Sequence, residues 1–211
     1  LSVPNEVLLY KMTKELKKEN TVILSGEGAD ELFFGYDRIF GWATKSQSWN
    51  LGEFDRFYSY GTNNDLEIVE DALSPFMHLN NPLDITAHFF QIAHLHGLLR
   101  RLDNATMLCS VEARVPFADH HPLIERMAGV SFNYRMRGGV VKDPLKRIFR
   151  DLIPDAIIKR VKVGFPVPLK KIFSSSRLGE TAMDSWLEFN LSKLCGTKVT
   201  QDDLGVPQKG E

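Results

Sequence analysis

Residues 25–31 (SGEGADE) contain two glycines and place three carboxylates within five positions. A helical pattern begins at the end of this segment. Gly26 and Gly28 allow a tight turn and a close approach of the backbone to a ligand. Because like charges a few ångströms apart repel unless a cation lies between them, the segment is a poor cradle for a bare phosphate. It suits a site in which Mg²⁺ joins Asp30 to a polyphosphate while Glu27 handles protons. The simpler interpretation makes Asp30 a helix N-cap and Glu27 a solvated turn residue.

Two other segments carry cations that could meet negative charge. Arg114, within residues 111–117 (VEARVPF), could neutralise a phosphate or carboxylate bidentately. Glu112 and Arg114 could instead be a simple surface pair. Lys162, within residues 160–168 (RVKVGFPVP), follows a cationic helix end and could face developing negative charge. Taken alone, such a pattern is most often a basic last turn that interacts with the helix dipole.

The histidines do not predict a metal centre. His94 and His96 are two positions apart, and residues at i and i+2 of a helix do not face each other. A core or groove role is the better interpretation, and with His78 and His88 scattered we predict no zinc or iron site. Asp119 is interpreted as a helix cap rather than a ligand.

The order of elements indicates where a site would lie. Residues 8–16 carry apolar side chains at helical spacing, and residues 21–24 (TVIL) are a β-branched run typical of a buried strand. The carboxylate-rich turn follows, and then a helical pattern over residues 31–36. Helix, strand, turn and helix form the repeating unit of an α/β protein with a parallel sheet. Ligands bind there at the carboxyl ends of strands, beside helix N-termini, and this turn occupies such a position.

Helices are predicted over much of the remaining chain. Residues 42–81 are interpreted as helices and loops on the rim of the fold, and residues 84–102 as one long helix, apolar on most faces and therefore buried. A second helical run is expected to reach about Arg114. Residues 143–144 (Asp-Pro) suit an N-cap and first turn, and Pro154 opens another helix. Only one convincing core strand is visible, so part of the sheet is predicted to be missing.

Composition excludes several classes of function. The chain has 26 basic and 27 acidic residues and a formal net charge of -1, so no nucleic-acid partner is predicted. Cys109 and Cys195 are too few for a disulfide framework, which favours a reduced, cytoplasmic protein. The most apolar stretch, residues 89–99, contains two histidines and is too short to cross a bilayer. The first residues, LSVPNE, lack the basic and apolar regions of an export signal.

Taken in order, the three segments resemble the asparagine synthetase family of glutamine-dependent amidotransferases. Residues 22–36 (VILSGEGADELFFGY) look like its pyrophosphate-loop signature. Residues 99–121 (LRRLDNATMLCSVEARVPFADHH) are similar to its arginine-and-proline block, and residues 145–168 (LKRIFRDLIPDAIIKRVKVGFPVP) resemble its closing lysine-loop motif. Three ordered motifs are far more specific than one, and the resemblance covers about residues 4–175.

The resemblance implies a fold and a reaction. The family's synthetase domain has an α/β, adenine-nucleotide α-hydrolase-like fold, with a parallel sheet flanked by helices. Residues 1–175 would be its C-terminal, helix-rich part, and residues 176–211 a C-terminal helix and polar tail. The domain uses ATP and Mg²⁺ to adenylate the β-carboxylate of aspartate, which releases pyrophosphate. Ammonia then attacks the acyl-adenylate to give asparagine and AMP.

The resemblance also implies roles for residues of the turn. Ser25 and Gly26 would approach the phosphates of the nucleotide. Asp30 would hold Mg²⁺ through pyrophosphate, and Glu27 would take a proton from the incoming ammonia.

Further roles fall outside the turn. Arg114 and Lys162 would stabilise phosphate and transition-state charge. Tyr36 and Glu112 match positions that are functional in relatives and would order the pocket, and Lys142 falls on a family lysine position that would meet the pyrophosphate.

Several features depart from the family pattern. Asn104 stands where arginine or lysine is often found, Ala118 replaces the usual leucine, and Lys146 occupies a common arginine position. The SGGxDS loop that binds ATP and the N-terminal cysteine nucleophile are not among these residues, and the chain begins at Leu1 rather than at methionine. We therefore expect only the pyrophosphate and acceptor half of a site, inactive by itself.

The missing half would bring the ATP-binding loop, either as a separate chain or as an earlier part of the same protein. A glutaminase domain outside this chain would release the ammonia from glutamine. A homodimer of the full enzyme is a further expectation.

Two other functions remain open. A lactam- or ring-forming relative would use another amine or acceptor, but the ring-closing relatives lack a glutamate at the position of Glu27. A non-catalytic interaction module could keep the fold, but Glu27, Asp30, Arg114 and Lys162 are all retained. Three crowded carboxylates would then serve no purpose.

Overall fold

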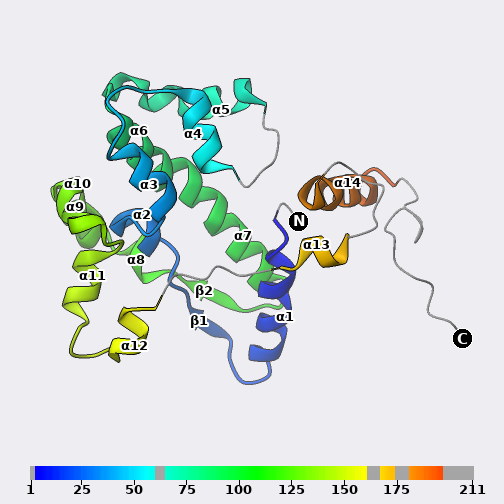
Figure 1. The fold of residues 1–211 in the computed structure, drawn as a ribbon. Coiled ribbons are helices and arrows are strands. Elements are labelled where there is room, and N and C mark those ends of the chain that lie inside the picture. The colour runs from blue at the N-terminus through cyan, green and yellow to red at the C-terminus, as the bar shows by residue number, and fades with distance from the viewer. Residues whose placement is uncertain (1–2, 60–64, 161–166, 174–180, 197–211) are drawn as a thin grey trace, which may run out of the picture.

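The computed structural model describes residues 3–59, 65–160, 167–173 and 181–196. The chain is mostly helical and contains a short parallel sheet of two strands, β1 (Val22–Leu24) and β2 (Glu112–Arg114), as Figure 1 shows. Val22 pairs with Glu112 and Leu24 with Arg114. The pairing extends at both ends, because Glu112 N–H donates to the Thr21 carbonyl (2.9 Å) and Ser25 N–H to the Arg114 carbonyl (2.8 Å). A helix-rich chain with a small parallel sheet is compatible with the predicted α/β class.

The strand at residues 22–24 is confirmed, but its predicted burial is wrong. Val22 and Leu24 are 38% and 74% exposed. In the observed register they share one face of the sheet with Glu112 and Arg114, which are exposed as well. We call these four residues the open sheet face. No layer of the described residues covers it, which explains why apolar strand residues remain in solvent.

The second strand replaces a predicted helix. Helix α7 (Leu95–Met107) ends seven residues earlier than the helix expected to reach about Arg114, and Ser110 adopts a left-handed conformation with φ of 53°. Glu-Ala-Arg favours a helix by local propensity. Hydrogen bonding to β1 overrides that preference, because residues 112–114 lie where a parallel neighbour can pair.

The main core is aromatic and is built from residues between Phe34 and Phe90, so it includes part of the region interpreted as a rim, residues 42–81. Its helices are α3 (Asp37–Ala43), α4 (Leu51–Tyr58), α5 (Leu66–Leu73), the 3₁₀ helix η1 (Ser74–Leu79) and α6 (Pro82–Phe89). Phe54 and Leu73 are fully buried within them. Phe34 stacks on Phe40 with ring centroids 4.1 Å apart. Residues 42–81 therefore contribute Trp42, Ala43, Phe54, Leu73 and Phe76 to the core, which corrects the rim interpretation for those positions.

The long helix expected over residues 84–102 is present and extends further in both directions. Helix α6 continues through a π-helical turn, η2 (Phe90–His94), into α7. Phe90 is buried, but Ile92 on the same turn is 59% exposed, so burial on most faces is wrong. His94 lies in the aromatic core, with Nδ1 3.1 Å from Tyr58 Oη, which confirms a core role for that histidine.

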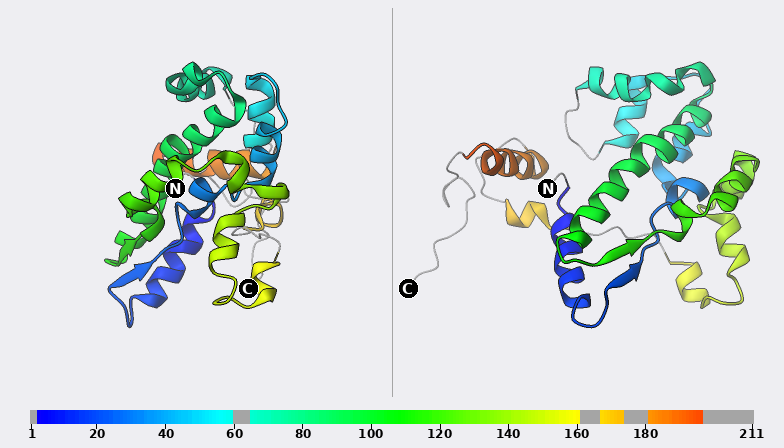
Figure 2. Two further views of the ribbon diagram at one scale, coloured as in Figure 1. Left: turned by 90° about the vertical axis from the view of Figure 1, so that its left-hand side faces the viewer. Right: turned by 180° about the vertical axis from the view of Figure 1, so that it is seen from behind.

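The helices at the chain ends lie away from this core. Helix α1 (Glu6–Leu16), confirmed where predicted, packs against α7. The views in Figure 2 place α13 (Leu169–Ile172) and α14 (Ala182–Leu194) on the opposite side of the molecule from the helices of residues 116–158. Those helices are α8 (Pro116–Asp119), α9 (His121–Ala128), α10 (Phe132–Arg135), η3 (Arg137–Gly139), α11 (Asp143–Ile148) and α12 (Asp155–Ile158).

Two predicted caps are wrong by one residue. His120, not Asp119, caps α9, because its side chain accepts a hydrogen bond from the Leu123 N–H at 3.1 Å. The N-cap of α11 is Lys142 in a left-handed conformation, and Asp143 is the first residue of the helix. Pro154 opens α12 as predicted.

A buried arginine ties these helices to α2 (Ala29–Phe33). Arg135 is 2% exposed and donates to the carbonyls of Leu32, Met127 and Val130. Its guanidinium also lies over the ring of Phe34, 5.2 Å from the centroid. Burial lowers the pKa of Arg135 to about 10, so it still carries its charge at neutral pH. Carbonyl dipoles and an aromatic face take the place of a counter-ion.

Candidate active site

The carboxylate-rich turn lies at the carboxyl end of β1, where the sequence predicted a site. Gly28, with φ of 91°, is the N-cap of α2. A Cβ at Gly28 would come within 3.0 Å of the Cβ and N atoms of Ala118, so glycine fits and a larger residue does not. A Cβ at Gly26 would meet no heavy atom within 4 Å, so the backbone there faces open space. The helical pattern expected over residues 31–36 ends early, because Phe34 turns left-handed with φ of 55°.

Glu27 is held by an arginine that the sequence analysis did not single out. Arg101 Nη2 lies 2.8 Å from Glu27 Oε1, and the two side chains are 13% and 21% exposed. Arg101 Nη1 also lies 3.4 Å from Asn5 Oδ1, just before α1. Glu27 is therefore an ion-paired residue, and its interpretation as a solvated turn residue is wrong.

Asp30 is paired with Lys142, one of the residues that the resemblance selected. Lys142 Nζ lies 2.9 Å from Asp30 Oδ1, with both side chains about a quarter exposed (26% and 23%). Asp30 is in the first turn of α2 and makes no N-cap, because Gly28 holds that position. Gly35 lies directly against the pair: a Cβ there would be 1.6 Å from Asp30 Oδ1 and 2.5 Å from Lys142 Cε.

Glu31, the third carboxylate of the turn, forms a buried pair with Tyr36. Glu31 is 1% exposed, and Tyr36 Oη donates to its Oε1 at 2.5 Å. Burial raises the pKa of the Glu31 carboxyl, and the charges of Asp30 and Glu27 add to the rise, although the tyrosine hydrogen bond opposes it. Burial also raises the pKa of the Tyr36 hydroxyl, followed by the charge of Glu31. Tyr36 thus joins the turn to the aromatic core, against Phe90.

The remaining predicted residues are placed differently. Arg114 Nε lies 2.9 Å from Glu112 Oε1, with side chains 61% and 57% exposed, so the surface-pair interpretation holds within this chain. The hydrogen bond and charge of Glu112 raise the pKa of Arg114. Only the Arg114 carbonyl reaches the turn, through Ser25 N–H. Lys162 lies outside the described residues.

The charge of the turn is balanced within the protein itself. Arg101 and Lys142 supply two protein cations beside the carboxylates, so the turn does not require Mg²⁺ for charge balance. Across the part of the chain that the structure describes, no group of three or more His, Cys, Asp and Glu side chains could hold a metal ion. Cys109 and Cys195 are free thiols.

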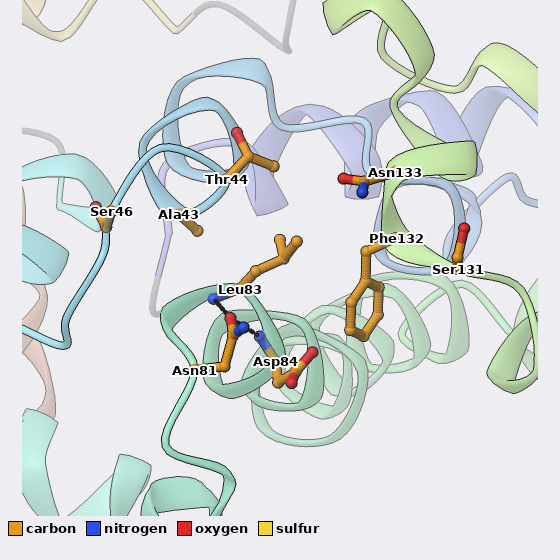
Figure 3. Close-up of a pocket in the computed structure, with 9 residues that line it drawn as sticks. All are labelled: Ala43, Thr44, Ser46, Asn81, Leu83, Asp84, Ser131, Phe132 and Asn133. Atoms are coloured by element: carbon orange, nitrogen blue, oxygen red, sulfur yellow. Dashed lines mark hydrogen bonds between the residues drawn. The ribbon is translucent and has the colours of Figure 1, made fainter.

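An open cavity lies elsewhere. It has a volume of about 410 Å³ and is lined at its edges by the end of α3 and the starts of α6 and α10, as Figure 3 shows. Asn81 Oδ1 is occupied there in capping α6, through Leu83 N–H and Asp84 N–H. None of the predicted site residues lines this cavity.

Comparison with known proteins identifies the family. The family model for asparagine synthase matches residues 1–194, nearly the whole chain. The chain belongs to the asparagine synthase family. It is similar to asparagine synthetase (glutamine-hydrolyzing) 1 of Bacillus subtilis (strain 168), at 27% identity over 81% of this chain and 34% of that protein.

Other relatives agree. Asparagine synthetase (glutamine-hydrolyzing) 3 of the same strain is 29% identical over 72% of this chain and 27% of its own length. A putative asparagine synthetase of Mycobacterium bovis is 26% identical over 85% of this chain and 34% of its own length. The chain thus spans about a third of the curated relatives that it matches. No solved structure shows a significant match.

Within the described ranges, none of the helices is both long and apolar enough to cross a membrane.

We predict that Gly35→Ala breaks the Asp30–Lys142 pair, because the added Cβ would overlap Asp30 Oδ1. Urea unfolding should show a loss of stability of about 1–3 kcal/mol, the range for buried overpacking. Gly41→Ala is the matched control: its Cβ meets nothing within 4 Å inside α3, so a gain of about 0.5–1 kcal/mol is expected. Equal effects of the two substitutions would contradict the close contact at Gly35.

We also predict a pH dependence of stability that comes from Glu31. Its pKa is raised in the folded state, so above about pH 4.5 the unfolded carboxyl loses its proton before the folded one does. Stability should therefore fall as pH rises through the raised pKa, with a slope of up to about 1.4 kcal/mol per pH unit for one proton. Glu31→Gln removes this slope. Unfolding curves for the two proteins that stay parallel from about pH 4.5 to 8 would contradict the assignment.

Proposed function

We propose that this chain supplies the pyrophosphate and acceptor side of an asparagine synthetase active site. In the complete enzyme, ATP would adenylate the side-chain carboxylate of aspartate, and ammonia would convert the adenylate to asparagine and AMP. Family membership supports the reaction. The observation that carries the proposal is the turn after β1, which holds Glu27 and Asp30 against separate cations at the carboxyl end of a parallel strand.

The Asp30–Lys142 pair is the proposed pyrophosphate site. Lys142 would contact the leaving pyrophosphate as a compact positive charge. Ser25 and Gly26 would offer backbone groups to the phosphates, and the open space beside Gly26 supports this role. Mg²⁺ is bound in such sites by one or two carboxylates together with substrate phosphates and waters. Asp30 fits that pattern, and the ion would neutralise charge on the phosphates.

Glu27 is the proposed proton acceptor. Arg101 occupies Oε1, and no described residue hydrogen-bonds to Oε2. When ammonia adds to the carbonyl carbon of the adenylate, the new C–N bond leaves a positive charge on nitrogen. Transfer of a proton from that nitrogen to Glu27 Oε2 leaves a neutral amide nitrogen as the bond to AMP breaks.

Tyr36 and Glu31 would act by placing the turn rather than by touching substrate. Their hydrogen bond fixes α2 against the aromatic core, and α2 carries Asp30. Their buried contact makes them part of the support of the site.

The rest of the enzyme would complete the sheet and the nucleotide site. Parallel sheets are normally covered on both faces, so the open sheet face suits further strands and helices of an α-hydrolase-like domain. Glu112 and Arg114 on that face would then border the nucleotide, and Lys162 would stabilise phosphate and transition-state charge. The ATP-binding loop and the glutaminase would lie in the two thirds of the relatives that this chain does not match. Residues 1–175 would belong to the synthetase domain.

The two ion pairs also give a structural reason to keep the carboxylates. A non-catalytic module with this fold would retain Glu27 and Asp30 for the contacts with Arg101 and Lys142. The presence of the carboxylates therefore does not separate enzyme from module, and a kinetic test is needed.

We predict that Glu27→Gln in the complete enzyme slows amide formation by about 10²–10⁴, the usual cost of losing a general base. Glutamine keeps the size of the side chain and one carbonyl oxygen for Arg101. Aspartate-dependent ATP–pyrophosphate exchange, which reports adenylation, should persist. Equal loss of both half-reactions would contradict the role of Glu27, and absence of exchange in the unmodified complete enzyme would contradict the proposed function.

A further inference from the structure

We propose that Arg101 is a positioning residue for Glu27, holding one carboxylate oxygen so that the other faces the attacking amine. The inference rests on the proposed function of Glu27. It assigns a role in amide formation to a residue on α7, which contributes no other residue to the proposed site.

The contacts of Arg101 fix the guanidinium from two directions. Nη2 donates to Glu27 Oε1 at 2.8 Å, and Nη1 donates to Asn5 Oδ1 at 3.4 Å. The side chain is 13% exposed, and its Nε is buried without a hydrogen-bond partner. Three segments distant in the sequence thus meet at one planar group. Such a charge-assisted contact is short and directional.

To accept a proton, the Glu27 carboxylate must be held in a fixed orientation. Glu27 lies on a glycine-flanked turn, and holding a glutamate side chain in one rotamer costs conformational entropy. Because Arg101 is held in place by α7 and Asn5, the Glu27 side chain is ordered when the protein folds rather than during the reaction. Misplacement of a reacting group by about 1 Å can cost on the order of 10²-fold in rate.

The neighbouring arginine provides a matched control. Arg100 precedes Arg101 on the same helix and is exposed, because adjacent helical positions do not share a face. No ion pair or hydrogen bond of its side chain appears among the described residues. Removal of Arg100 changes charge and helix propensity by the same amount as removal of Arg101, without touching Glu27.

The test is a double-mutant cycle in the complete enzyme. Amide formation and ATP–pyrophosphate exchange are measured for Arg101→Met, Glu27→Gln, their combination and Arg100→Met, with a thermal melt of each. Arg101→Met should slow amide formation by about 10–10²-fold and change exchange by less than about threefold. The combined variant should be no slower than Glu27→Gln, because Arg101 acts through Glu27. Arg100→Met should match the unmodified enzyme.

Other outcomes would overturn the inference. A purely structural Arg101 would slow both half-reactions equally, or its effect would multiply with that of Glu27→Gln. If Arg101→Met fails to fold, Arg101→Lys keeps the charge but lacks the planar fork. A Lys variant with unmodified turnover would contradict positioning, and one with a selective loss in amide formation would support it. If Glu27→Gln itself leaves amide formation intact, the proposed function of Glu27 fails instead.

Discussion

Three carboxylates on one tight turn repel one another, and each of them is stabilised by a different partner in the surrounding fold. Glu27 is paired with Arg101, and Asp30 with Lys142. Glu31 is instead buried, where desolvation raises its pKa and the Tyr36 hydroxyl donates to it. Unit charges about 4 Å apart interact by about 1 kcal/mol or more even in a polar medium, so these partners stabilise the turn.

Each of these three contacts involves a different part of the chain. Arg101 brings α7 and, through Asn5, the start of α1. Lys142 brings the loop before α11, in a left-handed conformation that places its ammonium beside Asp30. Glu31 connects to the aromatic core through Tyr36 and through the 3.4 Å contact of Gln91 Nε2 with the Glu31 carbonyl. The turn therefore couples the sheet, the long helix and the core, and its geometry depends on all three.

Sequence reasoning found the local parts of this arrangement. The strand at residues 22–24, the turn and helix α1 follow from short-range patterns, and they are present. The partner of Glu27 is 74 residues away and no local pattern indicates it. A signal did exist: Arg101 lies four residues before the buried Ala105, at the spacing of one helix face, and a cation on a buried face calls for an acidic partner.

The other predictions that were wrong also depended on contacts between segments distant in the sequence. Residues 112–114 favour a helix locally, and only the distant strand β1 makes them a strand. The open sheet face resulted from the same dependence, because burial of a strand is decided by layers that other segments provide. The aromatic core between Phe34 and Phe90 has no regular period along the chain, so sequence pattern alone could not distinguish it from a rim.

The proposed pyrophosphate site can be tested by binding Mg²⁺-pyrophosphate to the complete enzyme and following the backbone amides of this chain by NMR. The largest shifts should fall on residues 25–30 and on Lys142, and Asp30→Asn should abolish them. Shifts confined to the cavity between α3, α6 and α10, or shifts that survive Asp30→Asn, would contradict it.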